Sequence, residues 1–229
     1  MGSFPQSIVH YLPVTDHDER WGIVCTTAGY QNVPPGSPYP LTQHPDSYSF
    51  TRSRGRVLGE YQLLYIVSGQ GEFRSASSPA APVKAGTVVM LFPDEWHTYA
   101  PDPETGWEEW WVGFRGENID RRVAEGFFSP KTPLLHIGHS AGIVSCYQEI
   151  IRSAEEERKG FQQLVTGIVL HLLGSVLFKR DNLQYLDNPI VEKINRAREM
   201  MRRHIGDNLP PEEIARRLNI GYTWFRRTF

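Results

Sequence analysis

The chain has 229 residues, of which 40% are hydrophobic and 22% charged; this composition excludes intrinsic disorder and allows one large domain or two smaller ones. Its two cysteines, Cys25 and Cys146, are far apart and show no CxxC or Cys/His spacing, which argues against a disulfide or zinc framework and for a reducing compartment. The net charge of −2 divides into +4 over residues 190–229 and −6 over residues 1–189, a distribution that fits a C-terminal segment meeting polyanions and equally an ordinary solvated helix surface.

The N-terminus has no basic segment followed by an apolar run, so we expect no signal peptide. The longest apolar stretch, Leu164–Phe178, has 15 residues, whereas a membrane span needs about 20. We therefore expect a cytoplasmic protein without a membrane partner, in which this stretch is a buried or interface helix.

Residues before Glu117 carry the pattern of short strands. Apolar runs rich in β-branched and aromatic residues alternate with Gly, Pro and Asp turns, such as Ser68-Gly69 and Pro93-Asp94. The predicted strands are 61–69, 71–77, 86–93, 95–101 and 107–116. Strands of this length and spacing indicate an antiparallel barrel or sandwich.

Residues after Glu117 carry helical spacing instead. Helices are predicted over 118–127, 141–158 and 161–179, and the last has apolar side chains too widely spread for one neighbour to cover. A polar linker is expected at 180–189, closed by Pro189. Beyond it, apolar residues recur on one helix face at Ile190, Ile194, Ala197, Met201 and Ile205.

The last residues carry the spacing of a helix-turn-helix. A helix starting at Pro211 and another starting at Tyr222 flank the turn "NIG", and the inner-face positions are Ile214, Ala215, Leu218, Ile220, Phe225 and Phe229. Such a second helix enters the DNA major groove. The outward residues, predicted to contact DNA, are Tyr222, Thr223, Arg226 and Arg227. A helical hairpin with a charged face and no DNA function is the alternative.

The segment "LPPEEIARRLNIGYTWFRRTF" closely resembles the first helix-turn-helix of AraC/XylS-type transcriptional regulators. Upstream, "YQLLYIVSGQGEF" and "KAGTVVMLFPDEWHTYAPDPETGWEEWWVGFRG" are similar to the sugar-sensing cupin domain of that family, including its Gly-x-Gly turn. The resemblance covers about residues 50–229 in the family's order.

This resemblance implies an α+β chain in three parts. A cupin-like barrel of the double-stranded β-helix or jelly-roll type, together with a helical dimerisation segment, would occupy residues 1–179; a linker would follow at 180–189 and a partial all-α DNA-binding domain at 190–229. The family has two helix-turn-helix units and this chain carries most of the first, so we expect a truncated DNA-binding domain.

A metal site in the barrel is not expected. Metal cupins need two close His, a Glu and a later His, whereas this region offers Glu60, a lone His97 and a remote His44. We predict no metal, no cofactor, no catalytic residues and no enzyme activity.

A pocket for a neutral polar ligand remains, because aromatic faces stack on sugars while an Arg and a few polar groups orient them. By alternation, His97 and Tyr99 share one strand face, and Trp107, Glu109 and Trp111 share another. The resemblance implies that Arg54, Tyr99 and Trp111 line the pocket; Arg52 and Arg56 are chemically equal neighbours of the first. The predicted ligand-binding residues are Arg54, His97, Tyr99, Trp107 and Trp111.

Each of these side chains has a structural alternative: Trp111 and Tyr99 suit a barrel core, and a lone His97 suits a hydrogen-bonded structural role. Trp110 and Phe114 alternate to the opposite face and are expected to pack against the core or the helices.

The expected function is a ligand-responsive transcriptional regulator that senses a small molecule, most simply a sugar, and acts on DNA as a homodimer formed by the helices within 141–179. The effector would reposition the N-terminal arm (residues 1–20), the linker or the dimer contacts. Two rivals remain open: a ligand-binding and dimerisation module without DNA binding, and a cupin enzyme.

Overall fold

Short runs of β-branched and aromatic residues form the strands of the first part of the chain. In the computed structural model, which describes residues 7–40, 48, 51–186, 193, 197, 200, 201 and 210–228, all strand pairs are antiparallel. The strands are β1 (Ser7–Tyr11), β2 (Val24–Val33), β3 (Tyr61–Ser75), β4 (Ala81–Lys84), β5 (Thr87–Leu91), β6 (His97–Pro101), β7 (Trp107–Arg115) and β8 (Leu134–His136). The predicted antiparallel cupin-like barrel is confirmed.

The sheet runs in the order β1-β2-β7-β3-β5-β8, and β4 and β6 pair with the second half of β3. Two strands with a turn at Ser68-Gly69 were predicted where the structure has the single strand β3, so that prediction is wrong. The register shifts between Ile66 and Ser68, and Gly69 has a positive φ of 80°. This glycine bends the strand without reversing it, because backbone pairing continues on both sides of the bend.

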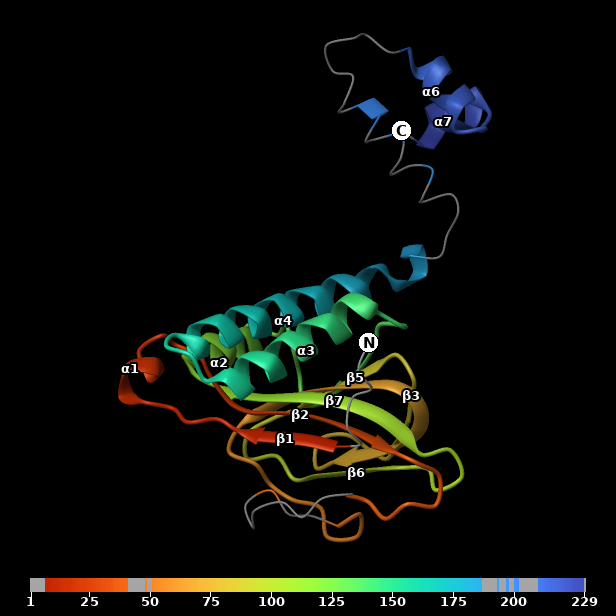
Figure 1. The fold of residues 1–229 in the computed structure, drawn as a ribbon. Coiled ribbons are helices and arrows are strands. Elements are labelled where there is room, and N and C mark those ends of the chain that lie inside the picture. The colour runs from red at the N-terminus through yellow and green to blue at the C-terminus, as the bar shows by residue number, and fades with distance from the viewer. Residues whose placement is uncertain are drawn as a thin grey trace. The chain divides into compact units, whose positions relative to one another are not determined.

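The main sheet has one face toward the barrel interior and one toward the helices (Figure 1). Interior side chains such as Leu64, Phe73, Tyr99 and Trp111 form one buried cluster, and Trp110 and Phe114 belong to a separate cluster on the helix side. The predicted alternation along β7 is therefore confirmed.

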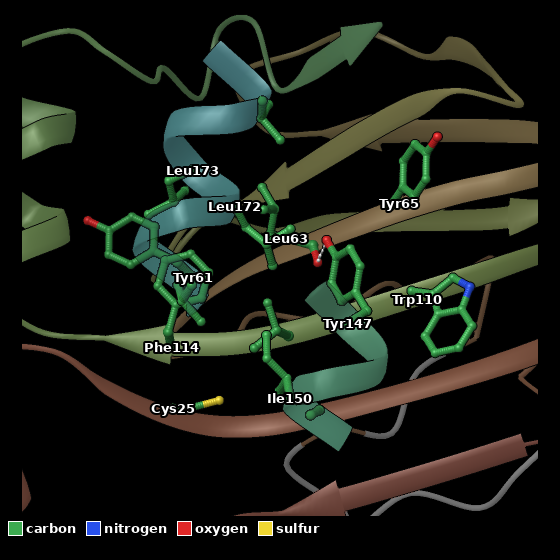
Figure 2. Packing of buried hydrophobic residues seen from close by; sticks show 14 of the residues in the cluster. Cys25, Tyr61, Leu63, Tyr65, Trp110, Phe114, Tyr147, Ile150, Leu172 and Leu173 are labelled. Atoms are coloured by element: carbon green, nitrogen blue, oxygen red, sulfur yellow. Dashed lines mark hydrogen bonds between the residues drawn. The ribbon is translucent and has the colours of Figure 1, made fainter. Parts of the chain in front are cut away.

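Four helices accompany the barrel: α1 (Asp16–Glu19), α2 (Glu117–Ala124), α3 (Ala141–Glu156) and α4 (Phe161–Leu186). Figure 2 shows Tyr147 of α3 directed at β3, where its hydroxyl donates to the Leu63 carbonyl at 2.9 Å. Trp110 lies beside it, with 6.5 Å between ring centroids. A buried phenol with a satisfied hydroxyl fixes α3 on the sheet at low polar cost.

Helix α4 is longer than predicted: it continues to Leu186, so residues 180–186 are helical instead of linker. The prediction failed because no Gly or Pro interrupts the chain before Pro189. By length and composition alone α4 could cross a membrane. However, Val165, Val169, Leu172 and Val176 pack into the helix-side cluster, as in a core helix.

The chain divides into two compact units, Met1–Arg180 and Asp181–Phe229. In the second, α6 (Pro211–Arg217) and α7 (Tyr222–Thr228) form the predicted helical pair. Ile214, Ala215, Phe225 and Ala197 are buried together, with Leu218, Ile220, Met200 and Met201 against them. The turn contains Asn219 at a positive φ of 50°, a conformation that Asn tolerates. The predicted positions Ile190, Ile194, Ile205 and Phe229 lie outside the described residues, as does His44.

Candidate ligand-binding cavity

A cavity lies inside the barrel against the inner faces of β1, β2 and β7. Its lining residues are Val9, Tyr11, Thr27, Gln31, Tyr39, Pro40, Tyr48, Arg56, Gln62, Tyr99, Glu109 and Trp111. The free volume inside this cavity, measured to the centre of a water-sized sphere, is about 20 Å³. This is room for about one water molecule. A larger ligand therefore has to displace side chains that now fill the barrel.

Arg56, and not the predicted Arg54, is the guanidinium of this cavity. Arg54 is exposed, and its carbonyl accepts a hydrogen bond from Trp96 Nε1 at 3.0 Å. Arg56 lies opposite His97 in an isolated antiparallel bridge, which turns its side chain inward. Its Nη2 donates to the Tyr99 hydroxyl at 2.7 Å and its Nη1 to the Tyr48 carbonyl at 2.6 Å.

His97 lies behind Arg56, outside the cavity lining. Its Nε2 accepts from Arg56 Nε at 3.3 Å, and its Nδ1 lies 3.0 Å from the Glu95 carbonyl. These partners assign the tautomer with the proton on Nδ1. Burial, and secondarily the charge of Arg56, lowers the pKa of His97 to about 4, so the ring is neutral at pH 7. The structure thus gives His97 the role of holding Arg56.

Tyr99 and Trp111 do line the cavity. Trp111 lies directly against the backbone of its cross-strand neighbour on β2: a Cβ placed on Gly29 would come within 2.1 Å of the indole. Trp107 is buried next to the cavity, where its ring packs edge-on to Tyr39 with 5.7 Å between centroids. The predicted aromatic residues are therefore brought together, with Trp107 in a supporting position.

Glu109 and Gln31 are cavity residues that were not predicted as ligand-binding. They face each other across the β2–β7 pair, and Gln31 Nε2 donates to Glu109 Oε1, which also accepts from the Tyr39 hydroxyl at 2.8 Å. Glu109 is only 1% exposed, and this burial raises its pKa to about 7. The alternation that pairs Glu109 with Trp107 and Trp111 already placed it on the inner face.

Several buried atoms of this group lack hydrogen bonds among the residues described: Glu109 Oε2, Gln31 Oε1 and Trp107 Nε1. The Trp107 N–H contributes to lowering the pKa of Glu109, but it does not reach regular hydrogen-bond geometry. Buried polar atoms without partners are costly. They are a feature expected where a ligand supplies the missing partners.

Glu60 forms a second buried acidic group at the edge of the cavity. Gln62 Nε2 donates to Glu60 Oε1 at 2.9 Å, and the Tyr48 hydroxyl donates to Glu60 Oε2 at 3.1 Å. Through Tyr48, the Glu60 group meets Arg56. A polar network of Glu60, Tyr48, Arg56 and Tyr99 thus lies in the same cavity as the group formed by Gln31, Glu109 and Tyr39.

No cluster of three or more His, Cys, Asp or Glu side chains suited to a metal occurs in the parts of the chain that the structure describes. The polar network of the barrel instead consists of amide, phenol, guanidinium and carboxylate groups, each spaced for hydrogen bonding.

In the second unit, the side chains predicted to contact DNA, Tyr222, Thr223, Arg226 and Arg227, are all exposed on α7. Between them Phe225 points into the core and is 2% exposed. On α6, Arg216 and Arg217 are engaged with Glu213, at 2.5 and 2.8 Å. One buried anchor thus holds α7 in place and leaves the four polar side chains on its outer face.

Comparison with known proteins identifies the family. A sequence model described as the AraC-like ligand binding domain matches residues 35–173. The chain is similar to the raffinose operon transcriptional regulatory protein RafR of Pediococcus pentosaceus, with 29% identity over 94 residues; that match covers 40% of this chain and only about a third, 34%, of the relative's length.

Two solved structures are similar over most of the chain. They are the AraC-like transcriptional activator CuxR (13% identity, 97% of this chain and 84% of that chain, TM-score 0.35) and apo ToxT from Vibrio cholerae (12% identity, 97% and 73%, TM-score 0.32). Because the sequence model spans more than half of the chain, from the segment before β3 into α4, this chain belongs to the AraC family, and its barrel is an AraC-like ligand binding domain.

Proposed function

We propose that the chain is part of a ligand-responsive transcriptional regulator whose barrel binds a small sugar-like effector. The observation that carries this proposal is the group of buried acceptors without partners, Glu109 Oε2 and Gln31 Oε1, among aromatic walls. A polyol offers hydroxyl donors to such acceptors and CH faces to rings such as Trp111. The name of RafR, which refers to a raffinose operon, supports a sugar.

The test is a thermal-shift screen of mono- and disaccharides. We expect at least one sugar to raise the melting temperature, because a ligand that binds the folded state alone stabilises it by mass action. If every sugar fails while another compound class stabilises the protein, the sugar proposal is wrong.

DNA binding is proposed for α7, through Tyr222, Thr223, Arg226 and Arg227. Arg side chains clamp phosphates or read guanine, so binding to a random-sequence DNA duplex should weaken as salt rises. In a gel-shift assay we expect Arg226→Ala and Arg227→Ala to reduce affinity, and Arg52→Ala, on the barrel, to leave it unchanged. No shift by residues 1–229 at moderate salt supports the rival module without DNA binding.

We further propose that the protein dimerises through the outer face of α3 and α4. A shallow apolar groove there is lined by Cys146, Leu164, Gly167 and Ile168 among others, and Leu164 is 53% exposed. Burial of such a face against a second copy is favourable. Sedimentation velocity should show Leu164→Glu shifted toward monomer, with Phe127→Glu, an equally exposed aromatic outside the groove, as the control.

A further inference from the structure

Among the atoms of the cavity lining, the open hydrogen-bonding capacity is one-sided, and this bears on the charge of the effector. The third open atom of this group, the Trp107 N–H donor, lies outside the lining. Gln31 and Glu109 are directly hydrogen-bonded, yet each keeps one buried oxygen without a partner among the described residues. Both open atoms are acceptors when Glu109 is ionised. The effector must therefore bring donors to this side of the cavity.

The cation of the cavity is already engaged. Arg56 donates to the Tyr48 carbonyl, the Tyr99 hydroxyl and His97 Nε2. Three of the five N–H donors of the guanidinium are thus used in holding Arg56 in place. An anionic effector would enter a space bordered by two buried carboxylates, Glu60 and Glu109, which repel it.

An ammonium group satisfies the same site better than a hydroxyl does. An ammonium group carries three donors on one atom, whereas a hydroxyl carries one. It can therefore donate hydrogen bonds to the open oxygens of Glu109 and Gln31 at the same time. It also brings a positive charge into direct contact with the Glu109 carboxylate, whose hydrogen-bond partners Gln31 and Tyr39 are neutral and on which the charge of Arg56 also acts. The faces of the surrounding aromatic rings attract cations as well.

We propose that the effector is an amino sugar or a similar amine-bearing polyol, whose ammonium group is bound by Glu109 and Gln31, and that sugar acids are rejected. This inference rests on the proposed function of the barrel as a sugar sensor. It makes Glu109 the residue that determines specificity for charge.

The experiment compares matched probes in the gluco, galacto and manno series: the hexose, the 2-amino-2-deoxyhexose and the hexuronic acid. Dissociation constants are measured by calorimetry at pH 7. We expect the amino sugar of at least one series to bind about tenfold more tightly than its parent hexose, because charge-assisted hydrogen bonds are roughly twice as strong as neutral ones. The hexuronic acid should show no binding.

Variants separate the charge preference from the fold. In Glu109→Gln, the amino sugar and the hexose should bind with equal affinity. In Gln31→Leu, the amino sugar should still bind more tightly than the hexose, but by less than tenfold. Glu108→Gln, its neighbour on β7 that alternates to the other face, should keep the tenfold difference. Thermal unfolding of each variant checks that it folds.

The outcomes distinguish the two proposals. If a hexose binds as tightly as its amino counterpart, or a hexuronic acid binds best, the amine proposal is wrong and the sugar-sensor proposal stands. If no probe of any series binds, the amine proposal is wrong, and the wider thermal-shift screen, which includes disaccharides, decides the sugar-sensor proposal separately. If the tenfold difference persists in Glu109→Gln, the amine is bound elsewhere and the assignment to Glu109 is overturned.

Discussion

Trp110 and Trp111 are adjacent in the chain and lie on opposite faces of β7. Trp111 lines the cavity, and Trp110 packs on Tyr30 and Tyr147 on the helix side. For a sugar found by the thermal-shift screen, we expect Trp111→Ala to weaken binding at least tenfold and Trp110→Ala to weaken it little. Trp110→Ala should instead lower stability by about 3–5 kcal/mol. Calorimetric titration and urea unfolding measure the two effects, and equal losses of affinity would show that the assigned faces are wrong.

Glu109 should make the stability of the protein depend on pH. Burial raises its pKa from 4.5 to about 7, so the folded state binds the proton more tightly than the unfolded state does. The cost of ionising Glu109 is absent below about pH 4.5, grows as the pH rises to about 7, and is then constant. It amounts to roughly 3 kcal/mol at most.

Relative to Glu109→Gln, the wild-type protein should therefore lose stability between pH 5 and pH 8. Urea unfolding of both proteins across this range measures the difference, because other titrating groups are common to the two. A difference that is independent of pH would contradict the raised pKa. Glu108→Gln, on the same strand, serves as the matched control.

For single residues, the sequence predicted well which face of a strand a side chain lies on. It predicted less well which polar residues line the cavity. Alternation placed Trp107, Glu109 and Trp111 on one side of β7 correctly, because strand side chains alternate regardless of context. Alternation could not decide which of three closely spaced Arg residues points into the cavity, because Arg54 and Arg56 are two positions apart and would lie on the same face. The bridge that turns Arg56 inward is formed with His97, which lies in a remote segment. Glu109 was passed over since its partner, Gln31, lies 78 residues away.

Among the elements, α4 is tied to the barrel by one buried amide. Gln162 Nε2 donates to the carbonyls of Pro13 and Cys25 at 3.0 and 2.9 Å, and its Oε1 accepts from the Cys25 N–H at 3.0 Å. Cys25 lies in β2, which also carries Thr27 of the cavity, and Pro13 follows β1, which carries Val9. The first turn of α4 is thereby joined to two walls of the barrel.

Gln162→Leu should consequently be strongly destabilising. It leaves the buried N–H and carbonyl of Cys25 without partners, at about 1–3 kcal/mol each before relaxation, and it also removes the bond to the carbonyl of the exposed Pro13. We therefore expect a loss of about 2 kcal/mol or more in urea unfolding. The adjacent Gln163→Leu removes a single bond to Asp18 near the surface and should cost less than about 1 kcal/mol. Similar losses for both variants would contradict the anchoring role of Gln162.

Helices and strands were predicted correctly where one face is exposed to solvent and the other is buried. The prediction failed where both faces are buried. Helix α3 has a clear apolar stripe, and its predicted span 141–158 agrees closely with Ala141–Glu156. Strand β2 was not predicted, because eight of its ten residues are buried and no alternation survives in its sequence. The division of β3 failed for another reason, since Gly69 has the local chemistry of a turn while its neighbours on both sides stay paired.

For the whole molecule, the barrel and the helical pair were predictable because each has its own period and its own buried cluster. Ligand identity was not, since the cavity is assembled from β1, β2, β3, β6, β7 and the segment between β2 and β3. Those segments are remote in sequence, and neither the partners of Glu109 nor the filled state of the cavity is encoded locally.

The single long strand β3 also has a kinetic consequence. It pairs with β4, β5, β6 and β7, so the pairings on both sides of the bend are carried by the same fifteen residues, and all four partner strands follow β3 in the chain. Folding should be slow for the size of the domain, as expected when contacts are non-local. We expect the two halves of β3 to open together, because one continuous strand carries both sets of pairings. Native-state hydrogen exchange should accordingly give the β3 amides of Leu63 and Phe73, one on each side of the bend, the same opening free energy.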